Sequence, residues 1–376
     1  MALAWPTAAG AGPVTPTFTT ADGYVPTGAA VIASRTTPGA QVVLGDTSFA
    51  VEAPTAQRVL GGTWRSGTTK GLDAFLYTPG PGKDGILHVR PSGDTYTSTF
   101  EPLPVNGTLQ PIATDVDGNG RTDILWYAPG PAPDYLWLFK QAGGFRQVPL
   151  RIDARATPIP FETGPTGPGA NTMARHLLWY GSGSAPDSLW TWDDQGGHIT
   201  RPLTIRGEGL RPIVGSFTTR YGTDSHDQIL WYSPHGRDSL WTWDRAGQSH
   251  RTSELPDMAA GYRPIVVGAF GNSIDPTAWQ GIFWYRPGTL SDRYWAFDGM
   301  HPAPKVTSLI VDGTYTPIGT VYRYEAAGQL RHVDAALMLG PTSLKRWDVG
   351  STIGQAASIA PIPPDPVGAT TSVQLL

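Results

Sequence analysis

Short apolar runs alternate with turn-forming residues along the chain, and one of these runs recurs at a fixed interval. Its clearest form is Ile-Leu-Trp-Tyr at residues 124–127, followed by a turn rich in proline and glycine and by a second apolar run. The tyrosine that ends the run marks five copies, spaced by 50, 53, 52 and 53 residues: Tyr77, Tyr127, Tyr180, Tyr232 and Tyr285. Two degenerate copies, around residues 30–33 and 336–339, bring the number of repeats to seven.

Each repeat of about fifty residues predicts four short strands. The first carries a proline phrase, such as Tyr-Val-Pro at 24–26 or Leu-Arg-Pro-Ile-Val at 210–214. The second is the Ile-Leu-Trp-Tyr run, which is apolar on both faces and therefore suits a strand covered on both sides. No stretch has helical periodicity. Because a four-stranded unit cannot cover both its faces alone, the units must stack. The sequence therefore predicts an all-β fold, a seven-bladed β-propeller of four-stranded antiparallel blades.

The repeats extend over about residues 18–361, which we expect to form the propeller. Two stretches lie outside them: an N-terminal arm rich in alanine, proline and threonine at 1–17, and a C-terminal tail at 362–376. Both are apolar and rich in proline rather than highly charged. We interpret them as arms whose targets the sequence does not identify, with other protein subunits as one class of candidate partner.

The composition is rich in turn-forming residues and argues against nucleic acid and membranes as partners. The 376 residues include 46 glycines and 36 prolines, while only 15% are charged and the formal net charge is -4. With no block of like charges, the chain lacks the field that attracts nucleic acid or anionic lipid. No apolar run is long enough for membrane insertion, and the opening residues lack the charged start and long apolar stretch of a secretion signal. The absence of cysteine excludes disulfides, thiol catalysis and cysteine metal sites.

One loop carries a metal-binding pattern, the sequence Asp-Val-Asp-Gly-Asn-Gly-Arg-Thr-Asp at residues 115–123. Oxygen-bearing side chains alternate along it, and its glycines permit a tight turn. The predicted ligands are Asp115, Asp117, Asn119, Arg121 through its carbonyl, and Asp123. A hard cation such as Ca²⁺ prefers an oxygen-rich cage of this kind, and we expect one calcium site that fixes the loop. The alternative is a hairpin loop held by hydrogen bonds from its own side chains to its backbone.

This loop runs straight into Ile-Leu-Trp-Tyr, and the combination resembles the FG-GAP or VCBS repeats of integrin-α-like seven-bladed propellers. The repeats are also similar to those of fungal and bacterial propeller lectins. The resemblance covers about residues 18–361, but the metal loop matches in one copy, since the counterpart at 65–73 reads Arg-Ser-Gly-Thr-Thr-Lys-Gly-Leu-Asp. The resemblance implies several metal sites and recognition of a glycan or cell-surface ligand, whereas this sequence supports a single site.

An aspartate opens the third predicted strand in five repeats, six or seven residues after the marker tyrosine. These residues are Asp84, Asp134, Asp187, Asp238 and Asp292. Because aspartate in a turn accepts hydrogen bonds from nearby backbone N–H groups, we interpret the five as structural turn residues. The alternative is a ring of ligand-binding carboxylates.

Most of the 14 tryptophans occupy equivalent positions in the repeats, which favours packing between neighbouring blades over ligand binding. Three such positions are occupied by Trp126, Trp179, Trp231 and Trp284, then by Trp137, Trp190, Trp241 and Trp295, then by Trp192, Trp243 and Trp347. Trp64 and Trp279 fall out of register, in or beside loops that precede a second strand. These two are the better candidates for contact with a ligand.

Motifs of known enzyme classes are absent from the sequence. The eight histidines lack metal-ligand spacing, and there is no nucleophile elbow, phosphate-binding loop or sialidase box. We therefore expect a non-catalytic module, secreted or attached to a cell surface or particle, that recognises a glycan or another cell-surface ligand. Two alternatives stay open. One is a structural or adaptor subunit of a larger toxin or phage-tail-like assembly, and the other is a glycoside hydrolase with paired carboxylates.

Overall fold

The computed structural model consists of strands joined by turns, and the residues it describes contain no helix. These residues are 24–26, 28–44, 47–64, 71–92, 95–152, 156–165, 173–181, 185–207, 209–218, 227–244, 246–267, 280–299, 301–325, 331–349, 356–361 and 365–372. Trp279 and the N-terminal arm at 1–17 lie outside the described residues. In this part of the chain, no helix has the length and apolar character needed to cross a membrane.

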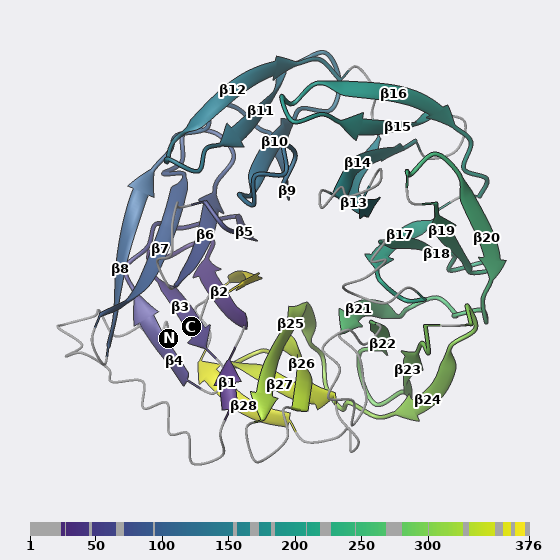
Figure 1. The fold of residues 1–376 in the computed structure, drawn as a ribbon. Coiled ribbons are helices and arrows are strands. Elements are labelled where there is room, and N and C mark those ends of the chain that lie inside the picture. The colour runs from purple at the N-terminus through teal and green to yellow at the C-terminus, as the bar shows by residue number, and fades with distance from the viewer. Residues whose placement is uncertain are drawn as a thin grey trace. The chain divides into compact units, whose positions relative to one another are not determined.

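The chain divides into two compact units. The first unit contains residues 1–108 and 314–376, and the second unit contains residues 109–313. Four antiparallel sheets make up the second unit, each with its strands in chain order (Figure 1). The first contains β9 (Gln110–Thr114), β10 (Asp123–Tyr127), β11 (Asp134–Phe139) and β12 (Phe145–Leu150). The second contains β13 (Thr157–Pro165), β14 (Met173–Tyr180), β15 (Asp187–Trp192) and β16 (His198–Leu203). The third contains β17 (Arg211–Gly215), β18 (Gln228–Tyr232), β19 (Ser239–Trp243) and β20 (His250–Glu254), and the fourth β21 (Arg263–Val267), β22 (Gly281–Tyr285), β23 (Asp292–Ala296) and β24 (Lys305–Leu309).

Three antiparallel sheets make up the other unit. One contains β5 (Arg58–Gly62), β6 (Leu72–Tyr77), β7 (Gly85–Ser92) and β8 (Thr95–Pro102). A second has the order β29-β2-β3-β4, with β29 (Pro366–Ser372), β2 (Gly28–Ser34), β3 (Ala40–Leu44) and β4 (Thr47–Val51). The third has five strands in the order β1 (Tyr24–Pro26), β25 (Thr316–Glu325), β26 (Arg331–Leu339), β27 (Ser343–Val349) and β28 (Ala356–Pro361).

Seven antiparallel sheets confirm the predicted fold class, an all-β β-propeller of seven blades. In three sheets of the second unit, the second strand (β10, β18 or β22) is buried along its length, as its two apolar faces require. The two degenerate copies are also strands, since residues 30–33 lie in β2 and residues 336–339 lie in β26.

The strands nearest the chain ends differ from the expectation. Residues 366–372, which we expected in a tail outside the repeats, form β29 and pair with β2 from Gly28 to Ser34. β1, expected as the first strand of the first repeat, pairs instead with β25 of the five-stranded sheet. The physical reason is that apolar β2 would otherwise leave one edge of backbone N–H and C=O groups unpaired, and the C-terminal segment supplies that partner.

Aromatic rings of successive sheets pack together in the core of the second unit. The tyrosine that ends a second strand contacts a tryptophan of the next sheet, with ring centroids 4.9 to 5.2 Å apart: Tyr127 with Trp179, Tyr180 with Trp231, and Tyr232 with Trp284. All eleven tryptophans that share repeat positions are buried. Their predicted role in packing is therefore confirmed.

Candidate metal centre

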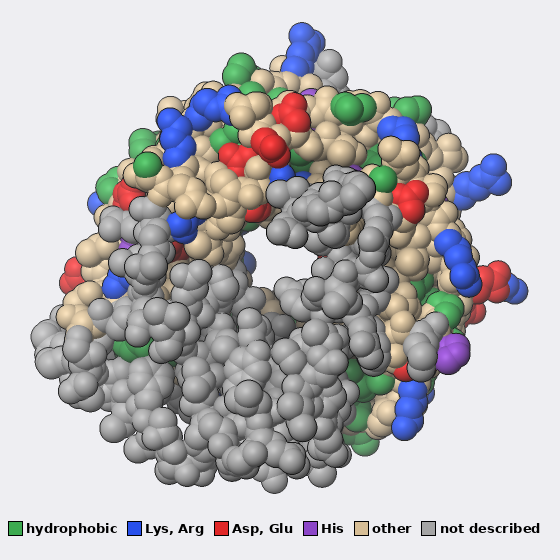
Figure 2. All heavy atoms as spheres, in the orientation of Figure 1, with side chains coloured by type: hydrophobic (Ala, Val, Ile, Leu, Met, Phe, Trp, Pro, Cys, Tyr) green, Lys and Arg blue, Asp and Glu red, His purple; other side chains and the backbone are tan. Residues whose placement is uncertain are grey.

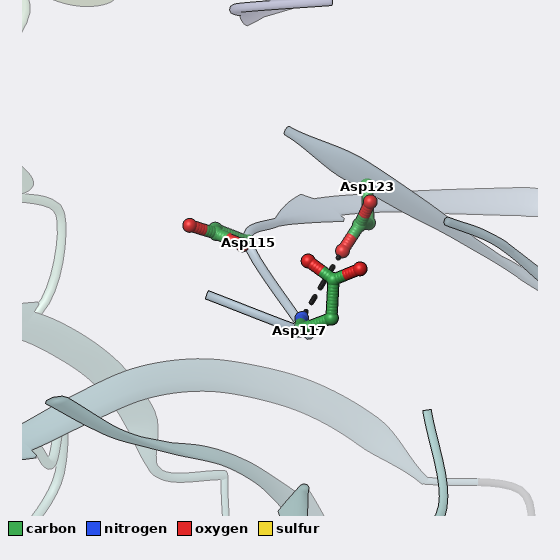
Figure 3. A group of neighbouring side chains, drawn as sticks. All are labelled: Asp115, Asp117 and Asp123. Atoms are coloured by element: carbon green, nitrogen blue, oxygen red, sulfur yellow. Dashed lines mark hydrogen bonds between the residues drawn. The ribbon is translucent and has the colours of Figure 1, made fainter. Parts of the chain in front are cut away.

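The loop at residues 115–123 joins β9 to β10 (Figure 3). Its first carboxylate folds the loop back on itself. Asp115 Oδ1 accepts a hydrogen bond from Gly118 N at 2.7 Å, and Asp115 Oδ2 accepts one from Gly120 N at 2.8 Å. The two glycines have φ values of 70° and 78°, a conformation that residues with a Cβ rarely adopt. The spacing of aspartate and glycine along the chain therefore specifies this turn.

Asp117 and Asn119 extend the same pattern. Asp117 Oδ1 accepts a hydrogen bond from Asn119 N at 3.2 Å, and Asn119 Oδ1 accepts one from Arg121 N at 2.7 Å. The Asn119 amide nitrogen donates to the carbonyl oxygen of Phe139 in β11 at 2.8 Å. These bonds turn the side-chain oxygens back toward the loop and fix the loop to the neighbouring strand.

Asp123 is the first residue of β10, has no exposed surface and anchors the loop through its carboxylate. Its Oδ2 accepts a hydrogen bond from Val116 N at 2.8 Å, and its Oδ1 accepts one from Phe139 N at 2.8 Å. Figure 3 shows its carboxylate next to that of Asp117, whose backbone nitrogen also donates to Asp123. A single buried carboxylate thus connects the loop, its own strand and β11.

Without a cation, burial and mutual repulsion disfavour the ionised forms of these carboxylates. Burial raises the pKa of Asp123 to about 7, with the carboxylates of Asp117 and Asp115 acting in the same direction and two backbone hydrogen bonds opposing them. Burial also raises the pKa of Asp117, with the Asp115 carboxylate acting in the same direction. A cation near these oxygens would favour their ionised forms and relieve the repulsion between them.

The donor set fits a hard cation. Carboxylate oxygens of Asp115, Asp117 and Asp123 all lie within 4.8 Å of one another. Ca²⁺ binds oxygen at 2.3–2.6 Å, so two ligands of one ion are at most about 5 Å apart. Across the described residues, this is the one such group of three acidic or histidine side chains. The structure therefore brings together three of the five predicted ligands, with Asn119 and Arg121 in the same loop.

Acidic side chains gather over β9, β10 and β11 on the face drawn in Figure 2. Glu162 of β13 is close enough to the loop to interact electrostatically with Asp115. Burial raises its pKa, and the carboxylates of Asp227 and Asp115 add to the effect, while Arg175 opposes it. Arg175 is a functional candidate that the loop pattern could not indicate, because it lies in β14 of the next sheet.

Another sheet of the same unit has a glutamine at the position of Asp123. Gln228 lies four residues before a marker tyrosine, as Asp123 does. Its Oε1 accepts hydrogen bonds from Phe217 N at 2.8 Å and Thr218 N at 2.7 Å. A neutral amide therefore accepts backbone hydrogen bonds at this position, as the carboxylate of Asp123 does, so these bonds alone do not require a carboxylate.

The five repeated aspartates are structural. Each accepts two backbone hydrogen bonds of 2.6–3.1 Å, one from the turn after the second strand and one from the chain beyond the fourth strand. The donors are Thr78 and Val105 for Asp84, Ala128 and Ile152 for Asp134, Gly181 and Ile205 for Asp187, Ser233 and Met258 for Asp238, and Arg286 and Val311 for Asp292. All five carboxylates are buried, so the turn interpretation is confirmed.

The two tryptophans chosen as ligand candidates have different outcomes. Trp64 is only 2% exposed and packs edge-on against Phe75, with ring centroids 6.2 Å apart. A buried indole presents no face on which a sugar could stack, so Trp64 belongs to the core of the first unit. Trp279 lies outside the described residues.

No protein-family model and no curated protein matches the chain. Solved structures do resemble it. A protein from Lactobacillus plantarum has a TM-score of 0.51 at 10% identity, covering 92% of this chain and 99% of that one. Apo AztD from Citrobacter koseri has a TM-score of 0.48 at 13% identity and covers 93% and 100%. A lectin from Aleuria aurantia, in complex with α-methyl-L-fucoside, has a TM-score of 0.41 at 12% identity and covers 82% and 96%. At these identities the likeness concerns the fold alone.

Proposed function

We propose that the protein is a non-catalytic binding module of the FG-GAP/VCBS type, in which Ca²⁺ at the 115–123 loop stabilises the β-propeller. The observation that carries the proposal is the approach of three carboxylates within 4.8 Å in a loop whose shape their own hydrogen bonds fix. Gln228 supports it, since a neutral side chain accepts backbone hydrogen bonds at the position equivalent to Asp123.

Calcium is the ion that this donor set favours. All the predicted ligands are oxygens, and Ca²⁺ accepts irregular sets of six to eight of them, whereas Mg²⁺ requires a near-ideal octahedron. The bidentate glutamate that ends an EF-hand loop is missing from this sequence. We therefore infer affinity in the range of extracellular modules, about 10⁻⁴–10⁻³ M, which agrees with a location outside the cytoplasm. In this role the ion orders the loop and takes part in no reaction.

The ligand that we propose is a glycan or another cell-surface molecule, on the basis of the repeat's resemblance to propeller lectins. The described repeat tryptophans are buried, so ligand contacts come from the loops that connect the strands. The alternative role as an adaptor subunit relied on both terminal arms. Residues 366–372 are used inside a sheet, which leaves the N-terminal arm at 1–17 as the segment for such a contact.

A glycan array tests the binding function. Wild-type protein is applied with about 2 mM Ca²⁺ and again with EDTA, beside Asp117→Asn, which removes one carboxylate charge but keeps an oxygen for the hydrogen bond from Asn119. We expect binding to a defined set of glycans that EDTA and the substitution both weaken. No binding to any glycan at high protein concentration would contradict the lectin form of the proposal.

A further inference from the structure

A buried arginine lies against the loop that we propose as the calcium site. Arg175 belongs to β14, one sheet beyond the loop, and is 7% exposed. A methyl group added to Gly118 would overlap its guanidinium. Two features therefore favour glycine at position 118: its positive φ and the guanidinium that fills the adjacent space.

The contacts of Arg175 do not account for burying its charge. Its Nη1 is 3.5 Å from the carbonyl oxygen of Val116 and 3.6 Å from Asp194 Oδ1. Both distances are longer than those of strong charge-assisted hydrogen bonds, and the Asp194 side chain is 82% exposed. A long contact with an exposed carboxylate contributes little, so neither contact offsets the cost of burying the guanidinium.

Carboxylates of the loop and of the adjacent strand act on Arg175. Glu162 is its partner in the register of β13 and β14. The positive charge of Arg175 also acts to lower the pKa of both Asp117 and Glu162. The guanidinium is thus a fixed monovalent cation beside the loop whose carboxylates a divalent cation would share.

We propose that Arg175 is a built-in counter-cation that sets the calcium affinity of the 115–123 loop, and this inference rests on the calcium site proposed above. Its charge partly neutralises the loop when Ca²⁺ is absent, which keeps the carboxylates together. The same charge repels Ca²⁺ as it binds. Arg175 therefore stabilises the calcium-free loop and weakens the affinity of the loop for the ion.

A purely structural role for Arg175 predicts the opposite sign. If the guanidinium only supports the loop through the Val116 carbonyl, its removal should disorder the ligands and weaken calcium binding. If its charge opposes the ion, its removal should tighten calcium binding by roughly tenfold, the size expected for one charge facing a divalent ion at a partly buried site. The direction of the change separates the two roles.

Calcium titration calorimetry on Arg175→Gln and Arg175→Met is the test, with Arg175→Lys and Arg237→Gln as controls. Lysine keeps the charge, so its calcium Kd should stay within about threefold of wild type. Arg237 lies in the turn between β18 and β19 and pairs with Glu254 of β20 at 3.0 Å. Its substitution removes the same net charge at a position away from the 115–123 loop. We expect the two neutral variants at Arg175 to bind Ca²⁺ about tenfold more tightly, while Arg237→Gln stays near wild type.

Unchanged or weaker binding in the neutral variants would overturn the counter-cation role while leaving the calcium site intact. Equal tightening in Arg237→Gln would overturn it too, because the effect would then come from net charge. Loss of the native near-ultraviolet circular dichroism in both neutral variants would make Arg175 structural. Absence of calcium binding in the wild type would instead refute the site itself, so the two failures are distinguishable.

Discussion

The repeated aspartates make the most direct structural prediction, and Asp187 is the clearest member. Its carboxylate is 6% exposed and accepts hydrogen bonds from Gly181 N at 2.9 Å and from Ile205 N at 2.7 Å. Asp187→Ala removes both acceptors and leaves two buried N–H groups without them. Each lost bond to a charged group costs about 1.5–3 kcal/mol, so for two bonds we expect a loss of roughly 3–6 kcal/mol in the free energy of unfolding.

Urea unfolding followed by tryptophan fluorescence measures this loss. Asp187→Asn should fall between alanine and wild type, because the amide oxygen replaces one acceptor while its NH₂ group faces the other donor. Asp194→Ala is the matched control in the same hairpin. Its side chain is 82% exposed, and we expect a change below about 0.5 kcal/mol. A loss under about 1 kcal/mol for Asp187→Ala, with a native spectrum, would refute the structural role.

Three further predictions concern the loop, the pH dependence and the chain end. Gly118→Ala should weaken calcium binding about tenfold in calorimetry, because of its positive φ and the Arg175 guanidinium, whereas Gly120→Ala, with open space around it, should have a smaller effect. Asp123 and Asp238 have pKa values raised to about 7 and about 6, so the stability that they contribute by binding protons is lost as the pH rises through those values. Calcium-free protein should therefore melt at a higher temperature near pH 6.5 than near pH 8. Below about pH 6.5 His176 has the opposite effect, because burial lowers its pKa to about 4 and the unfolded chain then binds the proton more readily. Deleting residues 362–376 removes β29 and exposes an edge of β2, so limited proteolysis should cut the truncated protein faster than the full chain.

The repeat pattern predicted the fold because each blade depends on local signals. The Ile-Leu-Trp-Tyr run, the turn and the aspartate that follows are adjacent in sequence, and the structure uses them as consecutive hairpins. The pairing of β29 with β2 could not be predicted in this way. It joins residues more than 330 positions apart, such as Ala33 and Val367, and residues 366–372 carry no repeat motif.

The candidate site shows the same division between local and long-range features. The turn from Asp115 to Asp123 follows from the spacing of its own carboxylates and glycines, so the sequence predicted which oxygens converge. Arg175 reaches the loop from the next sheet, and such a contact depends on how sheets pack. Trp64 is the converse case, because its place beside a loop suggested exposure while packing against Phe75 buries it.

Calcium titration calorimetry of the wild-type chain and of Asp117→Asn tests the central claim most directly. We predict one ion per chain, with a Kd of about 10⁻⁴–10⁻³ M for the wild type, at least about tenfold weaker binding for the variant, and a melting temperature that rises with Ca²⁺ in the wild type. A wild-type protein that shows neither binding nor a shift in melting temperature at about 10 mM Ca²⁺ would contradict the account, since the three carboxylates would then serve only to shape their own loop.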